Sequence, residues 1–455
     1  MNFGAARRCS TLVTRGKESG HTVTHSGEID LDPWRSRYAV RSSGLSASEV
    51  RSLFAVANRK EVVSLAGGMP FVRALPETAL VDTVAQVIRS HGPEALQYGS
   101  GQGDPGLREV ILDVMAREGI SARIDDVVVT TGSQQAIDLL AKLFVDPGDV
   151  VLVESPSYVG ALGVFRSYEA AIEHVPMDDH GLIPEALRER IRVLRSQGKT
   201  IKLLYVIPNF HNPAGVTLSS ARREEILDIA KEEGILLVED NPYGLIWFDS
   251  PAPAPIRSAD DEGVVYLGSF SKTFAPGLRV GWVVAPHGIR EKLILASEAA
   301  VLSPSVFTQL VIRSYFETED WRAQIEQFRL LYLERRDAME DAIRAHIPGL
   351  VHNTPGGGFF LWATLPEGLD SKDMLPRAIT ELVAYTPGTA FFANHEGRSH
   401  LRLAFCYPEP DRIREGIARL GRVIRDEIDI VNTFGPQQPS SRIDLHVDSP
   451  PPNLG

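Results

Sequence analysis

The sequence predicts an α/β protein in which helices cover both faces of a mainly parallel sheet, with a smaller α+β domain after it. Short apolar runs alternate with helical patterns through the middle of the chain. Strands that are apolar on both faces are typical of parallel sheets, because crossover helices cover each face. After about residue 318, long amphipathic helices flank a few shorter strands, which indicates the second domain.

Six apolar runs predict the strands of this sheet. Each run is rich in Val, Ile and Leu and has Gly, Pro, Asp or Ser at or next to its end, as short buried strands do. In chain order they are DDVVVTTG (125–132), DVVLVESP (149–156), IKLLYVIP (201–208), GILLVED (234–240), GVVYLGSF (263–270) and RVGWVVAP (279–286).

Helical patterns fill the intervals and dominate the end of the chain. SQQAIDLLAKLF (133–144) and SARREEILDIAKEEG (220–234) each open on a serine, and the second closes on a glycine. Two longer amphipathic helices are predicted over 321–346 and 410–428. We therefore expect a disordered leader over 1–40, an arm and part of the small domain over 41–97, the large domain over 98–317, the small domain over 318–432 and a disordered tail over 433–455.

Composition excludes several classes of protein. The chain has 455 residues, of which 43% are hydrophobic and 23% charged, and this is the composition of a globular protein with a large core. A net charge of −12 argues against a nucleic-acid surface. No apolar run reaches the roughly 18 residues of a membrane span. Two cysteines, far apart, predict neither a disulfide framework nor a metal site, so we expect a cytoplasmic protein without a membrane partner.

Polar side chains follow three of the predicted strands. Asn212 lies just after one strand, Asp240 ends the next, with Tyr243 three residues later, and Lys272 follows the third. Ligands of parallel sheets bind beyond the carboxyl ends of the strands, so these side chains are expected to converge on one crevice. Lysine is this chain's rarer cation, with nine among 47 lysines and arginines, and Lys272 is a candidate for amine chemistry.

These residues resemble the fold-type-I pyridoxal-phosphate enzymes of the class I/II aminotransferase family, in the branch of the 2-aminoadipate and kynurenine aminotransferases. The resemblance covers roughly residues 45–425. It implies a large domain with a mainly parallel sheet of the seven-stranded type and pyridoxal 5'-phosphate as cofactor. The motifs that carry it are VVSLAGGMP, LQYGSGQGDPGLREVI, TTGSQQAIDLL, ESPSYVG, YVIPNFHNPAG, VEDNPYG, GSFSKTFAPGLRVGW, PGGGFFLW, YTPGTAFF and HLRLAFCYPEP.

The resemblance implies a role for each polar residue around the cofactor ring. Lys272 would bind the cofactor covalently and then carry protons during the reaction. Asp240 would keep the pyridine nitrogen protonated, which makes the ring an electron sink. Asn212 and Tyr243 would hydrogen-bond the phenolic oxygen, and Tyr158 would stack on the ring face.

The resemblance also implies a phosphate site and a substrate site. A glycine-containing turn before a helix start offers N–H donors to the phosphate, and neither a GxGxxG nor a GxxxxGK[ST] motif is present. The phosphate would lie on Ser133, Gln134, Ser269, Ser271 and Arg279, with Tyr98 reaching it from the neighbouring subunit of a homodimer. The substrate would lie on Arg402, which grips its α-carboxylate, and on Asn212 and Gly68.

The sequence departs from the family pattern near the substrate. FVRALP (71–76) replaces a run that is usually richer in proline and ends in Phe-Pro, and His211 stands where glutamine is common. An amphipathic helix is predicted over SASEVRSLF (46–54), with Ser48 and Arg51 on one face. By resemblance, Arg51 would contact a distal carboxylate of the substrate. The simpler interpretation is that Ser48 and Arg51 only cap the helix and face the solvent.

The expected activity is a ping-pong exchange of amino groups. The donor would be 2-aminoadipate or an aromatic or leucine-like amino acid, and the acceptor 2-oxoglutarate. Another reaction of the same cofactor, such as that of a β-lyase, decarboxylase or cyclising enzyme, is the alternative, because the cofactor performs the chemistry and the site selects the bond. A transcription regulator with an aminotransferase-like domain is a third interpretation, disfavoured by the short polar region before Gly67 and the acidic charge.

Overall fold

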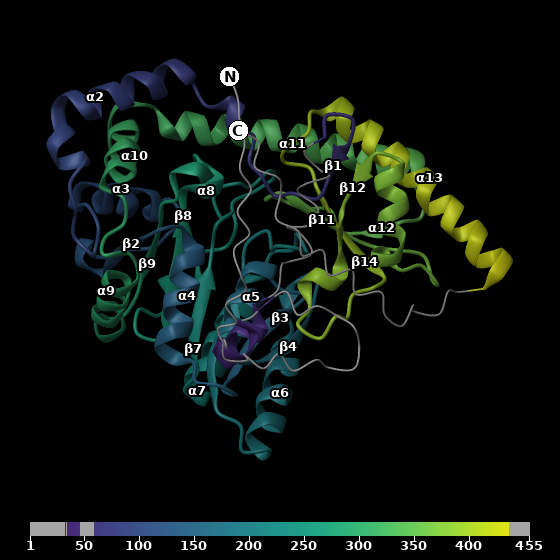
Figure 1. The fold of residues 1–455 in the computed structure, drawn as a ribbon, viewed down its shortest axis with the longest axis horizontal. Helices are drawn as coiled ribbons and strands as arrows, with labels where there is room; N and C mark the ends of the chain where they lie inside the picture. Colours follow the sequence, from purple (N-terminus) through teal and green to yellow (C-terminus); the bar gives the residue numbers. More distant parts are fainter. Residues whose placement is uncertain (1–31, 33, 46–58, 436–455) are drawn as a thin grey trace, which may run out of the picture.

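The computed structural model describes residues 32, 34–45 and 59–435. A large part is built on an eight-stranded sheet, and a smaller part on a four-stranded sheet lies beside it (Figure 1). Most of the predicted leader and tail, and the helix predicted around Ser48 and Arg51, lie outside the described residues. The domain boundaries at 98, 318 and 432 stay a proposal.

The large sheet confirms all six predicted strands and adds two. Its strands lie in the order β2, β9, β8, β7, β6, β3, β4, β5, with β9 antiparallel to both neighbours and the two-residue β5 antiparallel to β4. The remaining neighbours pair in parallel. The bounds are β2 Val127–Thr130, β3 Val150–Ser155, β4 Ala171–Asp178, β5 Gly181–Leu182, β6 Ile201–Val206, β7 Leu236–Asp240, β8 Val264–Ser269 and β9 Gly281–Val284.

Alternate residues of one strand enter different cores, which is why the apolar runs are continuous. Val151 and Val153 of β3 pack in the core under α4, α5 and α9, whereas Val150 and Leu152 pack in the core under α6 and α7. The sheet is therefore covered on both faces. These helices are α4 Ser133–Phe144, α5 Val159–Ser167, α6 Pro184–Ser196, α7 Ser220–Glu233 and α9 His287–Val301.

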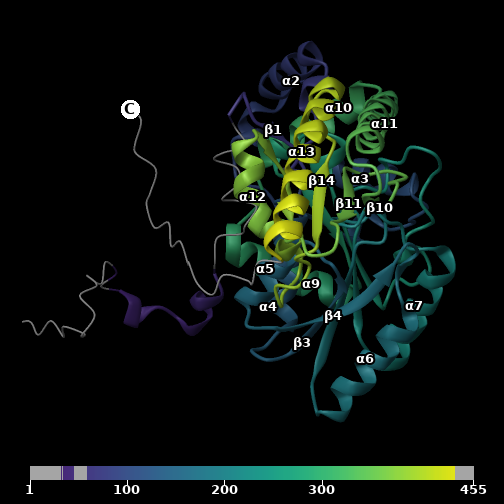
Figure 2. The same cartoon turned by 90° about the vertical axis from the view of Figure 1, so that its right-hand side faces the viewer.

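The smaller part joins the two ends of the described chain. Its antiparallel sheet has the order β10, β11, β14, β13, and β1 near the N-terminus pairs in parallel with β12. The long α11 runs along the top of the view in Figure 1, and α12 and α13 lie beside β14 in Figure 2. The bounds are β1 Val63–Ser64, β10 Val351–His352, β11 Phe360–Thr364, β12 Val383–Ala384, β13 Thr386–Pro387, β14 His400–Ala404, α11 Trp321–His346, α12 Ser371–Thr380 and α13 Pro410–Phe434.

The pairing of β1 with β12 has a consequence for the site. It fixes the chain just before Gly67 and Gly68 against the small part, and Leu65 and Ala404 continue this contact through a backbone hydrogen bond. The remaining helices are α2 Glu77–Ala95, α3 Pro105–Ala116, α8 Phe270–Thr273 and α10 Val306–Thr318.

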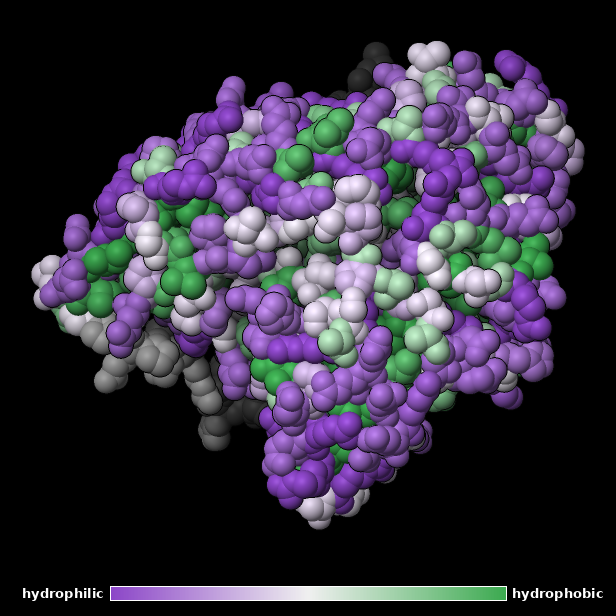
Figure 3. All heavy atoms as spheres, turned by 180° about the vertical axis from the view of Figure 1, so that it is seen from behind, coloured by the Kyte–Doolittle hydropathy of each residue, from purple (hydrophilic) through white to green (hydrophobic). Residues whose placement is uncertain are grey.

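The surface is mostly polar on the face seen from behind, with apolar residues in scattered groups (Figure 3). In the described part of the chain, no helix combines the length and the apolar character needed to cross a bilayer.

Candidate active site

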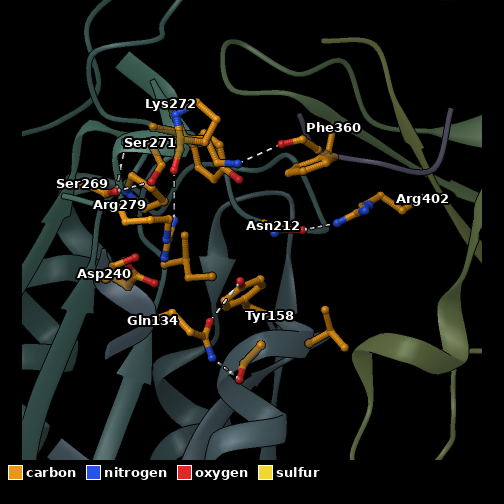
Figure 4. Close-up of a pocket in the computed structure, with 18 residues that line it drawn as sticks. Gln134, Tyr158, Asn212, Asp240, Ser269, Ser271, Lys272, Arg279, Phe360 and Arg402 are labelled. Atoms are coloured by element: carbon orange, nitrogen blue, oxygen red, sulfur yellow. Dashed lines mark hydrogen bonds between the residues drawn. The ribbon is translucent and has the colours of Figure 1, made fainter. Parts of the chain in front are cut away.

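A cavity of about 380 Å³ lies where the two parts meet, beyond the carboxyl ends of β6, β7 and β8. Arg402 and Phe360 reach it from the small part, opposite Lys272, Ser269 and Asp240 (Figure 4). The predicted residues that line it are Gly68, Ser133, Gln134, Tyr158, Asn212, Asp240, Tyr243, Ser269, Ser271, Lys272, Arg279 and Arg402.

The structure of the single chain does not test two of the predicted residues. Tyr98 is 77% exposed and does not line the cavity of its own chain. Arg51 lies outside the described residues.

Lys272 carries a partly buried amine. It lies in the single turn α8 after β8, and its Nζ donates to the Gly68 carbonyl oxygen at 2.8 Å. Burial, helped by the positive charges of Arg402 and Arg279, lowers the pKa of Lys272 to about 8. A lysine with this pKa is partly neutral near pH 8, and a neutral amine can attack a carbonyl carbon.

Asp240 is a buried carboxylate with one open oxygen. It ends β7 and is 2% exposed. Burial raises the pKa of Asp240 to about 6, while the hydrogen bond from the Tyr205 hydroxyl to Oδ2, 2.7 Å long, acts in the opposite direction. No described residue donates to Oδ1, which is also buried. The carboxylate is therefore ready to accept an N–H from a bound group.

Sequence reasoning missed Tyr205, the partner of Asp240. It lies on β6 in the run IKLLYVIP, which we interpreted only as a buried strand. A tyrosine within such an apolar run indicates a nearby polar group, because its buried hydroxyl needs a hydrogen-bond partner. Phe360 was also missed as an individual residue, although the motif PGGGFFLW contains it. Its ring centroid lies 4.1 Å from the Arg402 Cζ atom.

One corner of the cavity collects donors suited to an anion. Helix α4 begins at Ser133, as predicted, and its N-cap is Gly132. Gly132 has φ +76°, and a Cβ there would lie 2.5 Å from the Arg279 Nη2 atom, so glycine lets the guanidinium approach the start of the helix. The Ser269 hydroxyl donates to the Ser271 hydroxyl at 2.9 Å. Helix N–H groups, hydroxyls and a guanidinium together suit a phosphate.

Tyr158 and Gln134 hold each other against the cavity. The Tyr158 hydroxyl donates to Gln134 Oε1 at 3.2 Å, and Gln134 Nε2 donates to the Gly160 carbonyl oxygen at 3.0 Å. Tyr243 is 2% exposed and meets the ring of Phe360 edge-on. Burial raises the pKa of Tyr243 well above its usual range, so its phenol stays neutral and can donate.

Arg402 is a buried cation with a free donor. On β14, its Nη1 donates to Asn212 Oδ1 at 2.7 Å and its Nη2 to the Ala66 carbonyl oxygen at 2.6 Å. Burial lowers the pKa of Arg402 to about 10, which still leaves it charged at neutral pH. Its Nε is buried and has no hydrogen-bond partner among the described residues, so it can donate to a carboxylate.

Comparison with known proteins defines the class. The family model "Aminotransferase class I and II" matches residues 67–420, and the chain belongs to this family. It is 40% identical to aromatic-amino-acid aminotransferase 1 of Thermococcus litoralis, over 86% of this chain and 94% of that protein.

Two solved structures have the same fold. The kynurenine aminotransferase of Pyrococcus horikoshii, solved with PMP, has a TM-score of 0.82 and 40% identity, over 86% of this chain and 97% of that one. The α-aminoadipate aminotransferase of Thermus thermophilus, solved with N-(5'-phosphopyridoxyl)-L-leucine, has a TM-score of 0.81 and 34% identity, over 88% of this chain and 100% of that one. This protein is a pyridoxal-phosphate-dependent aminotransferase of fold type I.

The cavity fits that cofactor. The open Oδ1 of Asp240 suits a pyridinium N–H, and the Arg279 corner suits a phosphate. The amine of Lys272 can react with an aldehyde.

The first prediction concerns the cost of burying Asp240 without a ligand. Folding raises the pKa of the Asp240 carboxyl to about 6. The folded state is therefore destabilised at pH values above about 6, where Asp240 is ionised. This cost is absent below the pKa that the carboxyl has in the unfolded chain. Asp240→Asn should raise the free energy of unfolding of the cofactor-free protein by roughly 2–3 kcal/mol at pH 8. Denaturant unfolding should show this gain vanishing as the pH falls toward about 4. Equal stability of the two proteins at both pH values would mean that Asp240 is well solvated.

Proposed function

We propose that this chain moves the amino group of an aromatic, 2-aminoadipate-like or leucine-like amino acid to 2-oxoglutarate in two half-reactions. The observation that carries the proposal is the cavity that joins a depressed-pKa lysine, a buried aspartate with an open oxygen and a buried arginine with a free Nε. The related enzymes named for aromatic amino acids, kynurenine and α-aminoadipate support the donor classes.

In this proposal Lys272 both holds the cofactor and moves the proton. Bound pyridoxal phosphate supplies an aldehyde and an electron-withdrawing ring. The Lys272 Nζ would bind the cofactor covalently and, as a free amine, would accept and return the proton of the substrate Cα. Its low pKa supports this role, because a neutral amine can accept that proton.

The other residues orient the reacting groups. Asp240 Oδ1 would accept the pyridine N–H and keep that nitrogen protonated, and the Tyr243 hydroxyl and Asn212 Nδ2 would donate to the phenolic oxygen. Asn212 Oδ1 already accepts from Arg402, which leaves Nδ2 as its donor. Tyr158 would cover one face of the ring. The residues that would hold the phosphate are Ser133, Gln134, Ser269, Ser271 and Arg279.

Arg402 is the proposed carboxylate anchor for donor and acceptor alike. Its guanidinium is fixed by Asn212 and Ala66, and its free Nε, together with an Nη group, can face a substrate carboxylate next to Gly68. Arg51 stays a prediction for the distal carboxylate. The cytoplasmic location also stays a prediction.

The second prediction tests the function itself. Each candidate donor, added alone, should bleach the visible absorbance of the enzyme and yield its 2-oxo acid, and 2-oxoglutarate should then restore the absorbance and yield glutamate. Lys272→Ala should lower turnover by at least about a hundredfold, since proton transfer is lost. Borohydride followed by peptide mapping should find the label on Lys272.

Other outcomes identify the alternatives. A β-lyase would release ammonia without consuming 2-oxoglutarate, and a decarboxylase would release carbon dioxide. A borohydride label on a different lysine would contradict the assignment of Lys272.

The third prediction separates the substrate anchor from the cofactor site. Arg402→Lys keeps the charge but loses the planar fork, so kcat/KM should fall by the equivalent of roughly 1–3 kcal/mol for every donor. The absorbance of the bound cofactor should stay unchanged. An unaltered kcat/KM for every donor tested would show that Arg402 does not bind the substrate.

The fourth prediction concerns a homodimer with shared sites. Tyr98 is exposed, and apolar side chains of Val81 and Ile88 on α2 and Leu295 on α9 are exposed as well, which supports an interface there. We expect Tyr98 of one subunit to reach the phosphate site of the other. Tyr98→Ala and Lys272→Ala subunits should each be impaired as homodimers, whereas a mixed dimer should regain up to about half of the wild-type turnover. A mixture no more active than its separate parents would show that Tyr98 acts in its own subunit or not at all.

A further inference from the structure

A buried histidine and glutamate lie directly behind the cavity. His211 Nε2 and Glu154 Oε2 are 2.9 Å apart, and each side chain is 1% exposed. Neither residue lines the cavity, and the chemistry described above uses neither. Polar groups buried this deeply are costly unless they bond each other, so the pair calls for an explanation.

The hydrogen bonds determine which nitrogen of His211 carries the proton. The Ala214 backbone N–H donates to Nδ1 at 3.2 Å, so Nδ1 must be the bare acceptor and Nε2 the protonated nitrogen. Nε2 therefore carries the hydrogen, on the side of the ring that approaches Glu154 Oε2 to 2.9 Å. The contact misses hydrogen-bond geometry, and no described residue accepts a hydrogen bond from Nε2. Glu154 is thus the carboxylate in close contact with this donor.

The pair connects two loops that carry cavity residues. Glu154 lies near the end of β3, four residues before Tyr158, and its Oε2 also accepts the Ile207 N–H at 2.8 Å. Ile207 itself lines the cavity. His211 precedes Asn212, whose side chain accepts from Arg402 at 2.7 Å. A short chain of contacts therefore runs from β3 through His211 and Asn212 to the substrate arginine.

We propose that His211 is a positioning residue, which uses Glu154 as an anchor to fix Asn212 against Arg402 and the cofactor. Hydrogen bonds between His211 and Val216 and between Gly215 and His211 hold the backbone around Asn212 locally. The Glu154 carboxylate contacts this loop at Ile207 and at His211, and so ties it to the neighbouring strand β3. The proposal rests on the function proposed above for Asn212 and Arg402, and it adds the residue that orients them.

Two amide substitutions separate this role from simple capping of the loop. His211→Gln can place its Nε2 donor where the imidazole Nε2–H lies and so reach Glu154. His211→Asn can place its Oδ1 where Nδ1 lies, and so accept from Ala214, but it is too short to reach Glu154. If the Glu154 contact positions Asn212, the Gln variant should stay within about threefold of wild type. The Asn variant should raise the KM for 2-oxoglutarate about tenfold, because Arg402 loses its orientation.

A spectroscopic readout should follow the same order. A weakened hydrogen bond to the phenolic oxygen should shift the pH midpoint of the bound cofactor's visible absorbance upward in His211→Asn and leave it unchanged in His211→Gln. Leu204→Ala is the matched structural control, because Leu204 is a buried apolar residue of β6, the strand that leads into this loop. It should lower the melting temperature without moving the KM or the absorbance midpoint.

The possible outcomes distinguish a failure of the positioning role of His211 from a failure of the proposed function. A His211→Asn variant with a normal KM and a normal absorbance midpoint would overturn the positioning role. The role of His211 would then be limited to accepting the hydrogen bond from Ala214. Equal shifts in Leu204→Ala and His211→Asn would overturn it too, since loss of stability alone would explain them. A wild-type protein whose absorbance does not respond to any amino donor would instead reject the proposed function.

Discussion

The constraint on which the site depends is the burial of unlike charges in one cavity between the two parts of the molecule. Asp240 and Arg402 are buried and Lys272 is partly buried. Burial favours the neutral form of each group, so it raises the pKa of Asp240 and lowers the pKa of Lys272 and of Arg402. The protein alone does not compensate fully, since Asp240 Oδ1 and Arg402 Nε remain without partners among the described residues. A cofactor with a protonated ring nitrogen and a substrate with a carboxylate supply the missing partners. The unliganded protein is therefore less stable than it would be with these groups paired, because binding and reactivity require them to be open.

A second layer of contacts holds these groups in place by joining the ends of adjacent strands. Tyr205 on β6 donates to Asp240 on β7. After these strands, Asn209 Nδ2 donates to Asn241 Oδ1 at 2.9 Å, and Glu154 of β3 contacts His211. Each strand end is therefore tied to the next, and the cavity side chains extend from loops that cannot move independently. Such support matters because a catalytic group displaced by even 1 Å loses much of its effect.

Much of the fold could be predicted because the parallel strands are buried on both faces and form continuous apolar runs in the sequence. The same reasoning missed β4, since Ala171–Asp178 lies near the sheet edge, is largely only half-buried and carries polar residues such as Glu173 and His174. It also could not give the direction of β9, which is antiparallel to both neighbours although its apolar run looks like those of the parallel strands. Periodicity reports burial, and strand direction depends on the connections between strands.

The sequence by itself determined the residue types and their order at the strand ends, and with them the family and its cofactor. Lys272, Asp240, Asn212 and Arg402 could be named because each lies within a recognisable motif, and three of them lie at or just after the end of an apolar run. Only the tertiary structure decided which atoms of these residues are satisfied and which are left open, because hydrogen-bond partners such as Tyr205, Ala66 and Gly68 come from distant parts of the chain. Those contacts form between residues whose separation along the chain says nothing about their distance in space, and they require the folded sheet to bring the strand ends together.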